Sequence, residues 1–147
     1  MSDGKFKLDN DLPPLVPEKR YEVMMKAFRT AMMFGGKAPK LVMDFVIVTP
    51  GDHYGVVLPK YYNVTHIKGR PAENGEFKVG RKSDFARDFF SLFTVNHRKP
   101  DGFRMDLFEG ATLLAKVETV VWARNRSIPT NLQYSKIARL IKVLEHR

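Results

Sequence analysis

Basic and aromatic side chains are concentrated in two short segments of the chain that contain no carboxylate. The first, RTAMMFGGKAPK, contributes residues that could contact a polyanion: Arg29, Phe34, Lys37 and Lys40. The second, WARNR, contributes a tryptophan and two arginines: Trp122, Arg124 and Arg126. Cations neutralise the phosphates of a nucleic acid, and aromatic rings provide faces on which single-stranded bases stack. The two segments therefore indicate a candidate surface for single-stranded nucleic acid.

A third candidate group lies in YGVVLPKYYNV, where Lys60 precedes Tyr61 and Tyr62. Neighbouring residues of a regular strand point to opposite faces, so one of the two tyrosines is expected to face outward. Whether Tyr61 or Tyr62 faces outward depends on whether Pro59 lies in a bulge, and the sequence leaves this choice open. The alternative for all of these residues is structural: strand aromatics mostly fill cores, and lone cations are mostly solvated. For Trp122 the two roles are equally well supported.

Motifs for catalysis or cofactor binding are absent from the sequence. Gly35-Gly36-Lys37 lacks the GxxxxGK[ST] spacing of a nucleotide-binding loop, and a turn accounts for the two glycines. The histidines are scattered without the spacing of metal ligands: His53, His66, His97 and His146. The chain has no cysteine, which excludes disulfides and thiolate metal sites. We therefore expect a protein that is not an enzyme and that needs no cofactor or metal.

Composition and charge narrow the class of partner. The chain has 147 residues, which suits one domain, and 44% of them are hydrophobic, which favours a folded core. The formal net charge of +9 would attract nucleic acid, an anionic membrane surface or an acidic protein. The sequence contains neither an apolar signal segment nor a membrane-spanning run, and the lack of cysteine suits a reducing compartment. We expect a cytoplasmic protein with no membrane association.

The elements that would position these residues follow from the hydrophobic pattern. Residues 1–18 form a polar leader with three prolines and are expected to be flexible, whereas residues 19–147 form a single domain. Alternating polarity predicts strands from Arg20 and over 41–48, joined by the loop FGGKAPK, with Leu41, Met43, Phe45 and Ile47 on one face and Asp44 on the other. A third strand contains Pro59, which cannot donate a ladder hydrogen bond and favours an edge, a bulge or a break.

The second half of the chain predicts a helix, a strand and a further helix. SDFARDFFSLF has apolar residues at helical spacing, with Ser83 as the N-cap. FEGATLLAKVETVVWAR alternates as a long strand does. In LQYSKIARLIKVLEHR, apolar residues again recur at helical spacing: Ile137, Leu140, Ile141 and Leu144. This pattern predicts a C-terminal helix capped by Ser135, after a short strand near 132–134.

This order of elements is that of an OB-fold, a five-stranded Greek-key barrel with a helix between strands three and four. Several segments also resemble one family: the RYEV first strand, MFGGKAPKLVMDFVIV, YGVVLPKYYNV, FKVGRKSDFARDFFSLF and LQYSKI. In them the chain resembles OB-fold single-stranded-DNA-binding proteins from the replication modules of phages, plasmids and integrated elements. The resemblance spans about residues 20–138 and includes no catalytic motif.

The resemblance implies a mainly β OB-fold that binds single-stranded DNA with low sequence specificity. It implies a role in replication or recombination of a mobile element in the cytosol of a bacterial host, with replication or recombination proteins as partners. RNA as a ligand and a homo-oligomeric state stay open. OB-folds bind oligonucleotides on the face of strands two and three, between the loops joining strands one to two and four to five. All three candidate groups would then border one groove.

Two other functions remain as alternatives. A basic interaction protein would dock an acidic protein of the host or of the element, and would bind oligonucleotides only through weak charge attraction. A nuclease or resolvase would hold a metal ion with carboxylates such as Asp44, Asp84 or Asp88. The last two lie four residues apart on the predicted helix, but carboxylates near a helix N-terminus are more simply explained by the helix dipole.

Overall fold

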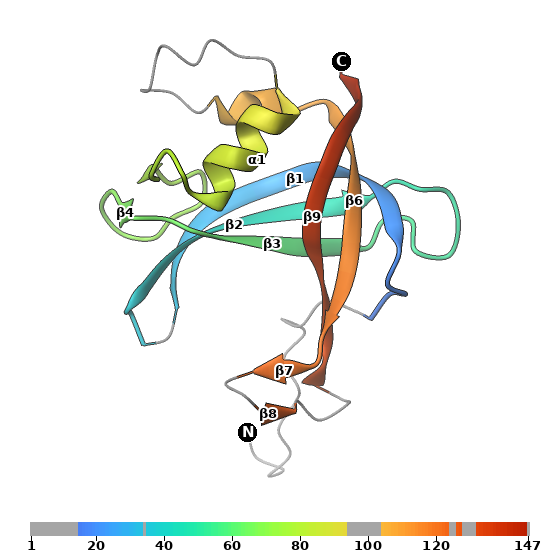
Figure 1. Ribbon diagram of the computed structural model, residues 1–147, viewed down its shortest axis with the longest axis horizontal. Coiled ribbons are helices and arrows are strands. Elements are labelled where there is room, and N and C mark those ends of the chain that lie inside the picture. Colours follow the sequence, from blue (N-terminus) through green and yellow to red (C-terminus); the bar gives the residue numbers. More distant parts are fainter. Residues whose placement is uncertain (1–14, 34, 94–103, 124–125, 128–131, 147) are drawn as a thin grey trace, which may run out of the picture.

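The computed structural model describes residues 15–33, 35–93, 104–123, 126–127 and 132–146; the side chains of Trp122, Ala123 and Arg126 lie outside the description. Five strands form one antiparallel sheet (Figure 1): β1 (Arg20–Met33), β2 (Ala38–Ile47), β3 (Val57–Asn63), β6 (Ala111–Val120) and β9 (Tyr134–His146). The smaller elements are β4 (His66–Ile67), β5 (Phe77–Lys78), helix α1 (Asp84–Leu92), a 3-10 turn (Met105–Phe108), β7 (Trp122–Ala123) and β8 (Arg126–Ser127). The chain is therefore mainly β, as the sequence predicts.

The strands of the large sheet follow the order β3-β2-β1-β6-β9. The first three are consecutive, and β6 returns to lie beside β1, which is the arrangement of a Greek key. In the described residues no hydrogen-bonded ladder joins the two outer strands, β3 and β9, so the sheet is open. The two strands are nonetheless in contact where they cross, because the sheet is strongly curved.

One face of this curved sheet and one side of α1 enclose the core. The predicted inner face of β2 is confirmed, since Leu41, Met43, Phe45 and Ile47 are all fully buried. From α1, Phe85 and Phe89 pack against this face. The predicted cap is also confirmed: the Ser83 hydroxyl accepts a hydrogen bond from the backbone N–H of Ala86 at 3.1 Å. Aromatic rings dominate this part of the core, where the Tyr62 and Phe85 centroids lie 5.2 Å apart.

The predicted C-terminal helix is wrong, because residues 134–146 form strand β9. The ladder between β6 and β9 shifts register three times, and each shift leaves one β9 residue without a partner: Ala138, Ile141 and Leu144. The apolar residues that pair with buried positions of β6 are Ile137, Leu140 and Val143. These bulges make inward-facing residues recur at every third position, which imitates the spacing of a helix.

The segment before β1 is attached to the beginning of β9. Val16 is buried, and its backbone N–H donates to the Ser135 hydroxyl at 2.8 Å. The same hydroxyl donates to the Val16 carbonyl at 3.3 Å, so Ser135 joins two segments 119 residues apart and is not a helix cap. Of the leader predicted over residues 1–18, residues 1–14 lie outside the described residues, and Val16 belongs to the core.

The connection between β3 and α1 folds back onto β1. Ala72 and Asn74 pair with the second half of β1, beyond the point where β6 leaves it: Thr30 N–H donates to the Ala72 carbonyl, and Asn74 N–H donates to the Phe28 carbonyl, both at 3.0 Å. Gly75 lies so close to this strand that a Cβ atom would be 2.4 Å from the Thr30 hydroxyl oxygen. This connection therefore covers the free edge of β1.

Candidate nucleic-acid interface

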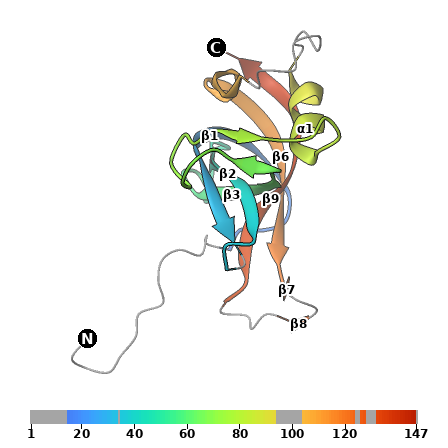
Figure 2. The ribbon, with the colours of Figure 1, turned by 90° about the vertical axis from the view of Figure 1, so that its left-hand side faces the viewer.

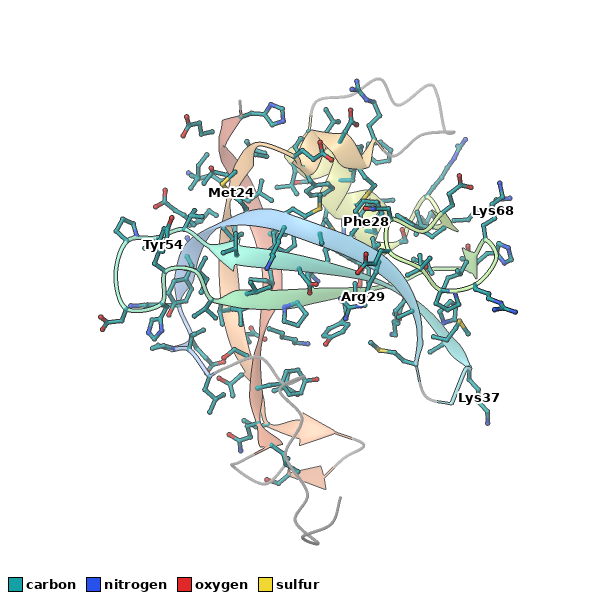
Figure 3. The ribbon with its side chains drawn as sticks, turned by 180° about the vertical axis from the view of Figure 1, so that it is seen from behind. Met24, Phe28, Arg29, Lys37, Tyr54 and Lys68 are labelled. Carbon is teal, nitrogen blue, oxygen red and sulfur yellow. The ribbon has the colours of Figure 1, made fainter. Side chains whose placement is uncertain are left out.

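The face of β1, β2 and β3 that points away from the core is built from rows of residues paired across the three strands. Arg29, Val42 and Tyr61 form one row, which we call the stacking row. Toward the β1–β2 turn follows a row of Ala31, Lys40 and Asn63, and on the other side a row of Ala27, Asp44 and Pro59. Residues paired across strands on one face have neighbouring side chains. Figure 3 views the molecule from this side, with Arg29 over the sheet.

The stacking row combines a cation and an aromatic ring. Val42 is fully buried although it lies on the outer face, because Arg29 and Tyr61 flank it on the neighbouring strands. The Arg29 guanidinium is exposed and forms an ion pair with Asp44, with Nη1 and Oδ2 3.0 Å apart. Burial raises the pKa of the Tyr61 phenol, and the nearby Tyr134 raises it further. Tyr61 is therefore a neutral, half-buried ring in the same row as a guanidinium.

Lys37 and Lys40 lie at the end of this face nearest the β1–β2 turn. The predicted loop over FGGKAPK is shorter in the structure, since β1 extends to Met33, β2 begins at Ala38, and a turn covers residues 35–37. Gly35 and Gly36 both have positive φ, at 70° and 82°, which favours glycine at these two positions. Lys37 is exposed in this turn (Figure 3). The Lys40 ammonium donates to the side-chain carbonyl of Asn63 in the same row.

Tyr62 and Lys60 point to the opposite face from Tyr61. Tyr62 is 2% exposed, and its hydroxyl donates to Asp88 Oδ2 of α1 at 2.7 Å, so no face of its ring is available to a base. The Lys60 ammonium lies 4.3 Å from the centroid of the Tyr62 ring. Burial lowers the pKa of Lys60, which Asp88 partly offsets. The structure therefore removes Tyr62 from the candidate interface and separates Lys60 from Tyr61.

Tyr134 is a candidate interface residue that the sequence did not indicate. It is the first residue of β9, is half-buried, and is close enough to Tyr61 to influence its pKa. The two tyrosines are 73 positions apart in the sequence (134 − 61), and only the fold brings them together. In the sequence, Tyr134 ends the short strand predicted near 132–134, a position at which a tyrosine ring is expected to pack against the core. Tyr61 and Tyr134 are therefore the aromatic residues of the candidate interface.

Strands β7 and β8, which contain the described part of the second basic segment, lie at the same end of the molecule as the β1–β2 turn. In Figures 1 and 2 the β7 and β8 strands and the β1–β2 hairpin extend toward one end, whereas α1 lies toward the other. Strands β7 and β8 pair with each other, and they include the backbone of Trp122 and Arg126. Phe34 and Arg124, and the side chains of Trp122 and Arg126, lie outside the described residues. Their predicted contacts with nucleic acid stay predictions.

Among the described residues, no group of three or more histidine or acidic side chains could hold a metal ion. Asp84 forms an ion pair with Arg87 on the surface of α1, and Asp88 accepts the hydrogen bond from Tyr62. Within the same part of the chain, no helix is long and apolar enough to cross a membrane.

Comparison of the chain with protein-family models, with curated proteins and with solved structures gave no match. A function is therefore inferred from the chemistry of the face formed by β1, β2 and β3.

Proposed function

We propose that this protein binds single-stranded DNA with low sequence specificity through the outer face of β1, β2 and β3. The ligand would cross the stacking row, with bases against Tyr61 and Tyr134 and phosphates near Arg29, Lys37 and Lys40. The binding requires no cofactor and no catalytic step. Replication or recombination of a mobile element in a bacterial cytosol is the cellular role that we infer from the resemblance in sequence.

The strand order supports an OB-fold, which we infer as the finer description of this open sheet. An OB-fold is a five-stranded, partly open Greek-key barrel that binds oligonucleotides on the face of its second and third strands. In the order β3-β2-β1-β6-β9, the second and third strands are β2 and β3, and they carry Lys40 and Tyr61. The loops expected to flank that face are the β1–β2 turn and the β7–β8 hairpin, which extend toward the same end (Figure 2).

The observation that carries the proposal is the position of Tyr61 on an outward face, in one row with a guanidinium and near a second tyrosine. Arg29 is its neighbour two strands away in the stacking row, and Tyr134 approaches it from β9. Binding without sequence preference needs aromatic faces for bases and cations for the backbone, and each stacked base contributes about 1–3 kcal/mol. This face provides both groups within one row.

The proposal is tested by titrating the protein into a labelled single-stranded oligonucleotide and following its anisotropy at low and physiological salt. Duplex DNA and single-stranded RNA serve as competitors. We expect Tyr61→Ala to weaken binding roughly 5- to 150-fold, the equivalent of one lost stack. Tyr54→Ala is the matched control, because Tyr54 is 66% exposed in the β2–β3 connection, away from the stacking row (Figure 3).

Three outcomes would contradict this function. Equal effects of Tyr61→Ala and Tyr54→Ala would remove the stacking row from the interface. Equal affinity for single strands and duplexes would remove the preference for single strands. Binding that disappears at physiological salt would indicate generic charge attraction. That last result would favour the alternative function, an interaction protein that docks an acidic partner.

A further inference from the structure

Asp44 is a carboxylate in the middle of a face that otherwise suits a polyanion. It lies on β2, next to the stacking row, between Ala27 of β1 and Pro59 of β3. Both neighbours have short side chains without hydrogen-bond donors. Its side chain is 28% exposed, and its Oδ2 is 3.0 Å from Arg29 Nη1.

A carboxylate at this position restricts how a nucleic acid can lie on the face. Phosphates are repelled by Asp44, so they should lie on the turn side of the stacking row, near Arg29, Lys37 and Lys40. A base stacked on Tyr61 would then extend its edge toward the next row, which is the row of Asp44. The residue therefore meets base edges and not the backbone of the ligand.

We propose that Asp44 makes the site favour bases that carry an exocyclic amino group, such as cytosine, over thymine. This inference rests on the proposed function. A carboxylate only accepts hydrogen bonds, and it has about four lone-pair positions, of which Arg29 Nη1 occupies one. Cytosine presents an amino donor at N4, for which aspartate is a suitable acceptor, whereas thymine presents the O4 acceptor there. Cytosine gains a hydrogen bond at Asp44, and thymine meets electrostatic repulsion.

Arg29 positions this carboxylate. The ion pair crosses from β1 to β2 and restrains the Asp44 side chain next to the stacking row. The pair also directs one carboxylate oxygen toward Arg29 and leaves acceptor capacity on the other side for a ligand. Arg29 thus contributes to the site in two ways, by neutralising nearby phosphates and by orienting Asp44.

The test compares the affinities for oligo(dC) and oligo(dT) of equal length at physiological salt, by competition against one labelled strand. We expect the wild-type protein to prefer oligo(dC) about 3- to 10-fold, the effect of one hydrogen bond to an exposed carboxylate. Asp44→Asn should bind both strands more tightly, because it removes a negative charge. The ratio of its affinities for oligo(dC) and oligo(dT) should fall toward one. An asparagine amide can both donate and accept, so it tolerates either base.

Asp52→Asn is the matched control, since it makes the same chemical change at an exposed position of the β2–β3 connection. It should leave the preference for oligo(dC) unchanged, and thermal unfolding should show that both variants are folded. An equal affinity of the wild type for the two strands, or an Asp44→Asn variant that keeps the full preference, would overturn the role of Asp44 but leave single-strand binding in place. Failure to bind either strand would overturn this role together with the proposed function.

Discussion

Tyr61 and Tyr62 are adjacent in the chain, but they lie on opposite faces of β3. The sequence shows that one of them must face outward, and the choice between them depends on Pro59. In the structure Pro59 lies in the ladder opposite Asp44, and the pairing of β2 with β3 continues without a register shift. Regular alternation is therefore preserved, and it places Tyr61 outward and Tyr62 in the core. A proline at the edge of an open sheet does not interrupt a strand, because its missing N–H group is not needed there.

The buried Tyr62 hydroxyl should contribute to stability and not to binding. Tyr62→Phe removes the hydrogen bond to Asp88, whose O···O distance is 2.7 Å. We expect the free energy of unfolding to decrease by about 1–2 kcal/mol, measured by urea denaturation, with DNA affinity unchanged. Tyr54→Phe is the control, since Tyr54 is exposed. Normal stability combined with weaker DNA binding would return Tyr62 to the interface.

The same residue makes stability depend on alkaline pH. Burial first, and then the neighbouring Asp88, raise the pKa of Tyr62 in the folded protein above the ordinary value of 10.0. The unfolded chain loses this proton near pH 10 and the folded chain retains it, so the Tyr62 contribution is complete below pH 10 and is lost as pH rises further. The decrease in unfolding free energy above that pH should be smaller in Tyr62→Phe than in the wild type.

At the scale of elements, alternation and capping predict the central strands and α1, and they fail at β9. Over 43–47 of β2 and 111–117 of β6 buried residues alternate with less buried ones, which is the simplest pattern to recognise. In β9 the three bulges replace a period of two by a period of three. The apolar spacing is visible in the sequence, where it looks like that of a helix. It results from the register of β9 against β6, a long-range pairing that the local sequence does not reveal. The docking of residues 72–75 on β1 is also a long-range contact, so the local sequence does not predict it.

Gly75 tests whether that docking stabilises the fold. A Cβ atom there would be 2.4 Å from the Thr30 hydroxyl oxygen and 2.9 Å from the Ala72 carbonyl oxygen. We expect Gly75→Ala to lower the free energy of unfolding by about 1–3 kcal/mol, because the connection must move away from β1. Gly80→Ala is the control in the same connection, since no atom lies within 4 Å of its Cβ position. Equal melting temperatures for the two variants would mean that the contact with Thr30 is not required.

At the scale of the whole molecule, the sequence predicts the residue types of the proposed interface, and the structure gives their arrangement on the face of β1, β2 and β3. Lys37, Lys40, Arg29 and Tyr61 lie on or beside one face, in segments that composition alone indicates. Tyr134 joins them only because the fold brings the beginning of β9 next to β3. Lys60 does not belong to this face, because its position on β3 is paired with Met43 on the inner face of β2. Composition therefore predicts a class of ligand, whereas membership of the site depends on strand parity and topology.

The net charge of +9 should make binding sensitive to salt, but only the cations that meet phosphates should affect the slope. The logarithm of the binding constant falls with the logarithm of salt concentration by about 0.7 for each phosphate neutralised on a single strand. Lys37→Gln should therefore make the slope less steep by about 0.7. Lys142→Gln, which removes an exposed cation of β9, should leave it unchanged. Equal changes of slope in both variants would show that binding depends on the net charge of the protein and not on a phosphate contact at Lys37.

The contact between Val16 and Ser135 has a consequence for the synthesis of the protein. The two residues are separated by 119 positions, and β1 needs β6 as a partner along its first half. A nascent chain therefore cannot complete its sheet until β9 has left the ribosome, and contacts of such long range slow folding. During that interval the apolar face of β1 and β2 is uncovered. We expect the growing chain to be prone to aggregation until β9 is made.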